Sequence, residues 1–192
     1  MLTFIRFPLS ALTILFFLLD KFACIEIGGG FTVFHLLGGF CFVVSVFTDF
    51  LDGYLARKWN VVSGFGKIFD PLADKLLING TMLVFWWRGY ILSVLTWTLI
   101  SRDILMDLIR LAFYRKRKII AAIKTAKYKT ATEMLGLIVL IFCFPKINTT
   151  LSLSSLVTGS FWGSQGLLFI ATIFSLMSFW QYIEKLREKT DG

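Results

Sequence analysis

The sequence predicts an all-α membrane protein, and its composition and its long apolar stretches lead to that prediction. The 192 residues are 57% hydrophobic and 17% charged, with a mean hydropathy of +0.77. Soluble domains are about half apolar and about a quarter charged. Since an open sheet cannot satisfy its backbone groups in lipid, the apolar stretches should be helices. We expect one domain, residues 1–192, with six transmembrane helices around a polar, metal-lined cavity that opens to the cytoplasm.

Six stretches are about as long as the roughly 20 apolar residues that cross a bilayer, although the fifth is short. They cover residues 2–19, 31–51, 68–87, 91–113, 130–145 and 161–183. The first could be read as a signal peptide. Its apolar run is long and no good small-residue cleavage site follows it, so we expect a retained helix.

The distribution of basic residues predicts the orientation of these helices. With the N-terminus in the cytoplasm, 14 lysines and arginines fall in cytoplasmic segments. The opposite side contains only Lys21, Arg88 and Lys146. Positive charge is retained on the cytoplasmic side, so both termini should be cytoplasmic. The net charge of +8 then suits anionic lipid headgroups, and we expect no nucleic-acid partner.

Four aspartates flank the cytoplasmic loop between the second and third predicted helices. Asp49 and Asp52 are three residues apart, and Asp70 and Asp74 are four apart. Each pair therefore lies on one face of its helix. The two helices are antiparallel and joined by a short loop, so the four carboxylates should meet at one membrane depth.

Four carboxylates in one place repel one another strongly, and burial at the membrane edge adds a cost. These two helices offer no matching cluster of basic residues. A hard divalent cation would neutralise the carboxylates, and all-oxygen ligands favour Mg²⁺, Mn²⁺ or Ca²⁺ over zinc. We therefore expect a metal site of Asp49, Asp52, Asp70 and Asp74, with two ions fitting four carboxylates better than one.

Small residues border the predicted metal site. Gly53 and Ala56 share a face with the first aspartate pair, and Gly66 precedes Asp70 by one turn. Small residues allow a ligand to approach the backbone closely. Arg57 adds a planar guanidinium group that suits phosphate. The pattern predicts a cavity for a bulky phosphate ester.

The segment from Asp49 to Asp74 resembles the signature of the CDP-alcohol phosphotransferase family at every fixed position. It reads Asp-x-x-Asp-Gly-x-x-Ala-Arg, eight residues, Gly, three residues, Asp, three residues, Asp. Within the family, the chain is most similar to phosphatidylglycerophosphate synthases. Arg102-Asp103, Arg110 and the run Lys127-Tyr-Lys129-Thr130 share in that resemblance. Two features depart from the subgroup. Asp103 replaces a Glu, and the Asn that usually precedes the Thr3-x-x-Arg6 element is missing.

The resemblance implies a metal-dependent transfer of a phosphatidyl group from CDP-diacylglycerol to glycerol 3-phosphate, with release of CMP. It assigns Mg²⁺ or Mn²⁺ to the aspartates and makes Asp74 the base that accepts the proton of the attacking hydroxyl. It places CDP-diacylglycerol against six residues, namely Asp49, Asp52, Gly53, Ala56, Arg57 and Gly66. It also suggests a homodimer.

A dianionic acceptor needs its own cationic site, and the resemblance places four basic residues there. These are Arg102, Arg110, Lys127 and Lys129. We interpret the run from Arg115 to Lys118 as a lipid-attracted basic segment instead. Glu133 follows Lys129 by one helical turn, so a local ion pair is expected. His35 lies in an apolar run, and we expect it to take no part in chemistry.

Three alternatives remain open from the sequence. The first is a cardiolipin synthase of the same superfamily, which would use phosphatidylglycerol as acceptor. The second is a divalent-cation transporter, although transport sites tend to lie at the membrane midplane. The third is a structural protein with an inactive site, which the complete set of motif carboxylates disfavours.

Overall fold

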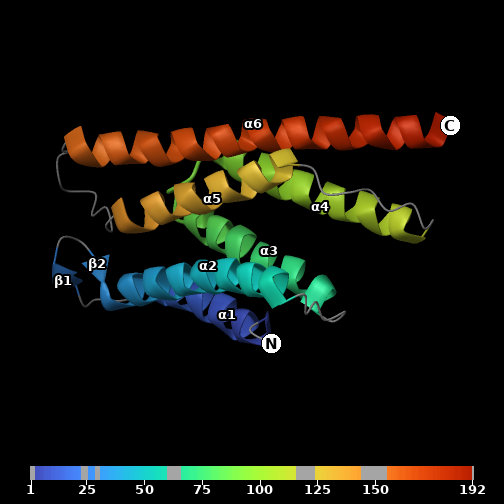
Figure 1. Cartoon of the computed structure of the whole chain (residues 1–192). Coiled ribbons are helices and arrows are strands. Elements are labelled where there is room, and N and C mark those ends of the chain that lie inside the picture. The colour runs from blue at the N-terminus through green and yellow to red at the C-terminus, as the bar shows by residue number, and fades with distance from the viewer. Residues whose placement is uncertain are drawn as a thin grey trace.

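The computed structural model describes the backbone of residues 3–22, 26–28, 31–59, 66–115, 124–143 and 155–191. This part of the chain forms six helices (Figure 1), namely α1 (Thr3–Leu19), α2 (Val33–Trp59), α3 (Gly66–Trp87), α4 (Ser93–Arg115), α5 (Lys124–Cys143) and α6 (Ser155–Asp191). The predicted all-α class is confirmed. Two short antiparallel strands, β1 (Glu26–Gly28) and β2 (Phe31–Thr32), precede α2 and were not predicted.

Each predicted stretch coincides with one helix, but α2, α5 and α6 extend beyond their apolar parts. α2 ends at Trp59 rather than at residue 51. α5 begins at Lys124 rather than at residue 130, and α6 reaches Asp191 rather than residue 183. The residues added at these last two ends are largely Lys, Glu and Arg, which are good helix formers. Hydropathy detects only the apolar portion of such a helix. With 37 residues, α6 is about 55 Å long, well beyond the ~30 Å hydrocarbon core.

Two groups of helices account for most of the packing. α5 lies against α6, and α1 lies against both α2 and α3 (Figure 1). Three pairs join α1 to α3 at a constant offset of 68 residues. They are Arg6–Asp74, Phe17–Phe85 and Asp20–Arg88. The constant offset means that α1 and α3 run in the same direction and in register.

Gly80 of α3 allows the close approach of α1. A Cβ atom at this position would lie 2.4 Å from Ile14 Cδ1 and 3.1 Å from its Cγ1, well inside van der Waals contact. Small residues that bring two helix backbones together are typical of helix contacts in membranes. The helices α1 and α3 therefore pack closely in the stretch between the Arg6–Asp74 and Asp20–Arg88 pairs.

The end of the bundle opposite the aspartates contains a buried polar network around Asp20. Its carboxylate accepts a hydrogen bond from Thr32 and pairs with Arg88. His35 lies between Asp20 Oδ2, 3.4 Å from Nδ1, and the Ile141 carbonyl oxygen, 2.8 Å from Nε2. Burial raises the pKa of the Asp20 carboxyl, but hydrogen bonds from His35, Thr32 and Arg88 more than offset burial and hold that pKa below its usual range. The network links α1, α2, α3 and α5, which agrees with the structural role expected for His35.

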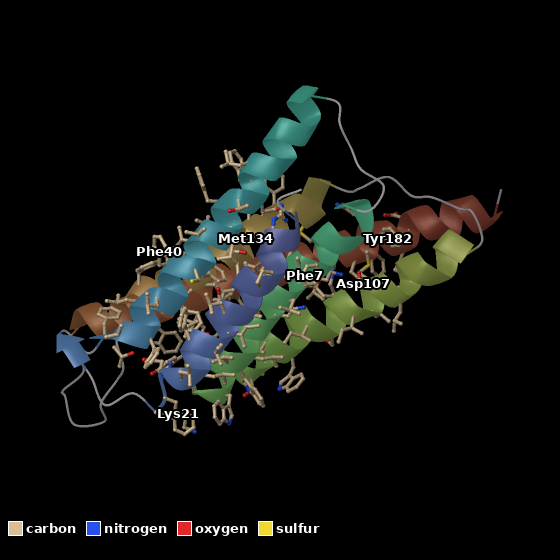
Figure 2. All side chains as sticks on the ribbon, turned by 90° about the horizontal axis from the view of Figure 1, so that it is seen from below. Phe7, Lys21, Phe40, Asp107, Met134 and Tyr182 are labelled. Carbon is tan, nitrogen blue, oxygen red and sulfur yellow. The ribbon has the colours of Figure 1, made fainter. Side chains whose placement is uncertain are left out.

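Polar and apolar side chains are distributed as expected for a chain surrounded by lipid. Large apolar side chains are exposed along α2 and α6, with Phe40 66% and Trp180 72% exposed. Figure 2 shows Phe40 projecting away from the helices. Ser10, Thr13 and Ser164 are fully buried instead. In water, the exposure of these large apolar side chains would be unfavourable. In a bilayer, by contrast, the contacts between helices are rich in small polar residues.

Two helices of the described part are long and apolar enough to cross a bilayer. The spans are Val33–Leu51 in α2 and Trp162–Glu184 in α6. α3 and α4 contain charged residues well inside their length, among them Asp74, Lys75, Arg102 and Asp103. Composition alone therefore identifies fewer spans than the six helices observed, and six transmembrane helices remain a prediction.

Candidate active site

The backbone places all four motif aspartates on two helices. Asp49 and Asp52 lie one turn apart in α2, and Asp70 and Asp74 lie one turn apart in α3. Gly53, Ala56 and Arg57 follow in α2, and Gly66 is the first residue of α3. The side chains of Asp52, Arg57 and Asp70 lie outside the described residues. The helical spacing of both pairs agrees with the prediction, and the convergence of all four carboxylates stays a prediction.

Arg6 of α1 joins the two motif carboxylates whose side chains are described. One guanidinium nitrogen, Nη1, is 2.5 Å from Asp49 Oδ1 and 3.1 Å from Asp74 Oδ1. The Arg6 side chain is only 3% exposed. Asp49 on α2 and Asp74 on α3 therefore face each other across a single buried cation, as expected for two helices that converge at this depth.

The Arg6 contact also bears on the predicted metal site. Two carboxylate oxygens from different helices already share one positive charge, and hard divalent cations prefer oxygen ligands of this kind. Among the described side chains, no three Asp, Glu, His or Cys residues lie in an arrangement that could hold a metal ion. The donor chemistry of Asp49 and Asp74 thus fits a divalent ion, and the other two predicted ligands, Asp52 and Asp70, have side chains outside the described residues.

A pocket of about 170 Å³ opens beside Asp74. We call it the polar pocket. Helices α3, α4 and α5 supply its walls, which consist of Asp74, Lys75, Ile78, Asn79, Arg102, Asp103, Met106, Lys129, Thr130 and Glu133. Three residues that the sequence assigned to the reaction, Asp74, Arg102 and Lys129, thus line one cavity. Arg110 and Lys127, the other two acceptor residues predicted, have side chains outside the described part.

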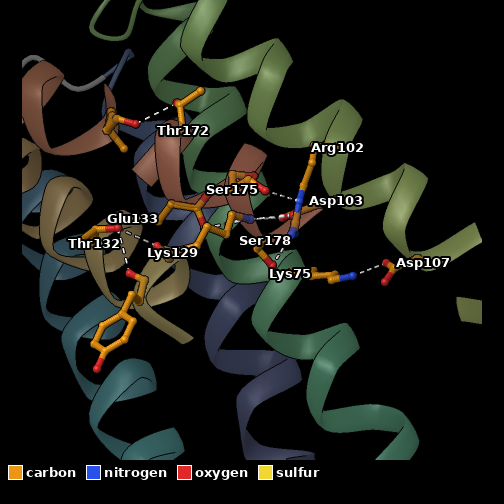
Figure 3. Close-up of polar contacts among 12 residues, drawn as sticks. Lys75, Arg102, Asp103, Asp107, Lys129, Thr132, Glu133, Thr172, Ser175 and Ser178 are labelled. Carbon is orange, nitrogen blue, oxygen red and sulfur yellow. Dashed lines mark hydrogen bonds and ion pairs between the residues drawn. The ribbon is translucent and has the colours of Figure 1, made fainter. Parts of the chain in front are cut away.

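Lys129 is fully engaged inside the polar pocket (Figure 3). Its Nζ is 2.6 and 2.7 Å from the two Asp103 oxygens and 3.1 Å from Glu133 Oε2. These three acceptors match the three N–H donors of an ammonium group. The Lys129 side chain is 4% exposed. The ion pair expected between Lys129 and Glu133 is confirmed, and Asp103 is an additional partner that the sequence did not reveal.

Arg102 ties this cluster to α6. It donates to the Ser175 carbonyl oxygen at 3.2 Å, to Ser178 Oγ at 2.9 Å and to Asp103 Oδ1 at 3.1 Å (Figure 3). At the edge of the pocket, Lys75 of α3 pairs with the half-exposed Asp107 of α4. These contacts hold α3, α4, α5 and α6 in one arrangement around the cavity.

The charges that line the polar pocket balance. Three carboxylates, Asp74, Asp103 and Glu133, face three cations, Lys75, Arg102 and Lys129. An incoming dianion would thus need positive charge from elsewhere, such as bound metal or the basic residues near the helix ends. An uncharged hydroxyl would be accepted without that requirement. Asp74 belongs both to this pocket and to the Arg6 contact, so it lies between the predicted metal site and the predicted acceptor site.

Sequence reasoning missed two contributors. Arg6 was noted only as part of an N-terminal element, although it contacts both motif helices. Asp103 was noted only as a departure from a subgroup, although it holds Lys129. A charged residue within an apolar helix is a usable signal, because it is costly in lipid unless it is paired. Its partner cannot be identified without the packing.

An all-helical bundle with a carboxylate motif on two adjoining helices and a small charged pocket beside it agrees with the expected membrane-embedded transferase. The chain belongs to the CDP-alcohol phosphatidyltransferase family, whose model matches residues 1–179.

The chain is similar over most of its length to bacterial relatives named CDP-diacylglycerol–glycerol-3-phosphate 3-phosphatidyltransferase. The Mycoplasma genitalium protein is 37% identical, with 94% of this chain and 80% of the relative covered. The Mycoplasma pneumoniae protein is 35% identical, with 96% and 85% covered. The Bacillus subtilis protein is 31% identical, with 80% and 75% covered. Together with the two apolar helices, family membership indicates a membrane protein.

Proposed function

We propose that this protein transfers the phosphatidyl group of CDP-diacylglycerol to glycerol 3-phosphate, yielding phosphatidylglycerophosphate and CMP. The observation that best supports this reaction is the placement of Asp74, which belongs to the motif and also lines the polar pocket with Arg102 and Lys129. The names of the three relatives supply the same donor and acceptor.

Divalent metal, Mg²⁺ or Mn²⁺, would be held by Asp49, Asp52, Asp70 and Asp74, and four carboxylates suit two ions better than one. When bound, it would neutralise charge on the transferred phosphoryl oxygens and on the departing CMP. Arg6 touches two of these carboxylates, so it would hold α2 and α3 at the separation that the ligands require. Its positive charge also reduces the repulsion between Asp49 and Asp74.

The nucleotide part of the donor would lie along the motif face of α2 and the start of α3. Gly53, Ala56 and Gly66 would admit the cytidine and pyrophosphate close to the backbone, and Arg57 would pair with phosphate oxygens. A guanidinium group forms two parallel hydrogen bonds to such oxygens. The acyl chains of the donor would remain in the surrounding lipid.

On the acceptor side, Asp74 would accept the proton as the glycerol 3-phosphate hydroxyl attacks phosphorus. Arg110 and Lys127 would hold the acceptor phosphate. Arg102 and Lys129 belong to the same predicted acceptor group, but their donors are already engaged by Asp103, Glu133 and α6. We therefore propose that these two residues shape the pocket and contribute to acceptor binding through their charge.

We further propose that all six helices cross the bacterial inner membrane, that the chain is a single domain over residues 1–192 and that it forms a homodimer. The excess of basic residues on one side supports cytoplasmic termini and a cavity that opens to the cytoplasm. An impermeant thiol reagent applied from outside should label a cysteine introduced at Asn148 but not one at Asn60. Labelling of Asn60→Cys alone would reverse the orientation.

The decisive test of the reaction is an assay of the purified protein with CDP-diacylglycerol and separate acceptors, following CMP release. We expect release with glycerol 3-phosphate. Release with phosphatidylglycerol alone would identify a cardiolipin synthase instead. Absence of release with every alcohol, combined with Mn²⁺ uptake into proteoliposomes, would favour a cation transporter.

A further inference from the structure

Two buried oxygens in the polar pocket have no hydrogen-bond partner among the described residues. They are Glu133 Oε1 on α5 and Asn79 Oδ1 on α3. The Glu133 side chain is 1% exposed, and only its other oxygen, Oε2, is paired, with Lys129. A buried carboxylate oxygen without a donor is costly, and such atoms in native proteins call for an explanation.

The neighbouring cations cannot supply the missing donors without breaking contacts that they already make. The three N–H donors of Lys129 meet Asp103 and Glu133 Oε2. The guanidinium group of Arg102 meets Asp103, Ser175 and Ser178. The two oxygens are thus left for a group that enters the cavity.

The chemistry of the two oxygens restricts what that group can be. The Glu133 oxygen belongs to a carboxylate, so an ionised phosphate, which has only acceptor oxygens, would be repelled from it. A hydroxyl both donates and accepts. It can donate to Glu133 Oε1 and accept from the Asn79 amide nitrogen, since a side-chain amide exchanges its two ends by rotation.

Position along the helices agrees with this choice. Asn79 follows Asp74 by five residues on α3, which is about 7.5 Å along the helix axis. Both residues line a cavity of about 170 Å³, a size suited to a small polyol rather than a whole lipid. One acceptor hydroxyl next to Asp74 leaves the neighbouring hydroxyl of the same molecule close to Asn79 and Glu133.

We propose that Asn79 and Glu133 bind the non-reacting, central hydroxyl of the glycerol phosphate acceptor and so select a vicinal diol over a simple alcohol. This assignment rests on the proposed transferase activity. A site built to hydrogen-bond a hydroxyl rejects the analogue that lacks it, because the buried polar groups then remain unpaired.

The test compares glycerol 3-phosphate with 3-hydroxypropyl phosphate, which lacks only the central hydroxyl. For the unmodified protein we expect kcat/KM to favour glycerol 3-phosphate by about ten- to a hundred-fold, the usual effect of one charge-assisted hydrogen bond. Asn79→Leu and Glu133→Gln should lower kcat/KM for glycerol 3-phosphate and leave that for the analogue nearly unchanged. The preference should therefore shrink, most strongly in Asn79→Leu, which loses both polar ends of the amide.

Thr81→Val is the matched control. Thr81, also on α3, has a buried hydroxyl oxygen with no hydrogen-bond partner among the described residues. Unlike Asn79, Thr81 does not line the polar pocket. Its substitution should leave the preference between the two acceptors unchanged. The KM for CDP-diacylglycerol should be unaffected in all three variants.

Several outcomes would overturn the assignment. An unmodified protein that uses both phosphates equally well has no central-hydroxyl site. Equal losses for both acceptors in Asn79→Leu and Glu133→Gln would mean that these residues only support the fold. Failure of the unmodified protein to release CMP with either phosphate would instead refute the proposed function, so the two failures are distinguishable.

Discussion

Replacing Lys129 by methionine should destabilise the protein strongly. Methionine keeps the length and the apolar stem of lysine but removes the charge that Asp103 and Glu133 share at 2.6 to 3.1 Å. All three side chains are at most 9% exposed, so water cannot replace the lost cation. Removing one partner of a buried ion pair costs about 3–5 kcal/mol. For a chain of this size, about 2–4 °C is lost per kcal/mol, so the melting temperature should fall by roughly 6–20 °C.

A buried thiol in the structure supplies the assay. Cys41 on α2 is 8% exposed and becomes reactive when the bundle opens. With Cys24 and Cys143 replaced by serine, a thiol-reactive fluorophore on the detergent-solubilised protein should report unfolding at Cys41 during heating. The second substitution Glu133→Gln, made in the Lys129→Met background, removes the carboxylate that has lost its cation, whereas Asp103 still pairs with Arg102. It should therefore recover a substantial part of the lost stability.

Lys75→Met is the matched control, since it removes a lysine whose pair with Asp107 is much more exposed, at 31% and 48%. Exposed ion pairs contribute about 0–1 kcal/mol, so the melting temperature should fall by no more than about 4 °C. Equal shifts for Lys75→Met and Lys129→Met would refute the reasoning. A Lys129→Met protein as stable as its parent would also refute it, and Lys129 would then be free to bind acceptor phosphate directly.

Three further predictions concern the reaction. Chelation by EDTA should abolish CMP release, and Mg²⁺ or Mn²⁺ should restore it, whereas full activity in a metal-free preparation would contradict the metal site. Asp74→Asn should lower turnover by about 10²- to 10⁴-fold, the usual contribution of a positioned base, with little change in CDP-diacylglycerol binding, while Asp70→Asn should weaken donor and metal binding. Equal binding losses in both variants would mean that the carboxylates act as one cage. Arg110→Ala and Lys127→Ala should each raise the KM for glycerol 3-phosphate by about ten- to a hundred-fold without a matching change for the donor. Arg117→Ala is the control, and a similar effect of all three substitutions would indicate a general loss of positive charge.

The helices were predictable because each contains a long, largely apolar run. Hydropathy does not predict the ends of a helix that continues into charged residues. The start of α5 at Lys124 and the end of α6 at Asp191 lie in charged segments that hydropathy ignores. The two short strands before α2 are stabilised by pairing with each other rather than by a long periodic pattern, so nothing in the sequence pattern specified them.

The aspartates of the site were predictable from spacing on single helices, and their partners were not. That Asp49 and Asp52 share a face follows from helix geometry alone. The contact of Arg6 with Asp49 and Asp74, and that of Lys129 with Asp103, depend on which helices pack together and at what height. Sequence shows that a charge in an apolar helix needs a partner, but only the packing selects it. The oxygens of Asn79 and Glu133 that have no partner among the described residues are likewise recognised only from the packing of the helices.

The parallel registration of α1 with α3 has a consequence for how the protein is made. Arg6 and Asp20, at the two ends of α1, find their partners Asp74 and Arg88 on a helix synthesised 68 residues later. At about 5–20 residues per second, the ribosome needs several seconds to deliver that helix. During this interval, of the partners described above, Arg6 has only Asp49, and Asp20 has only Thr32 and His35. The charge pairing of α1 with α3 is therefore complete only after α3 has been synthesised.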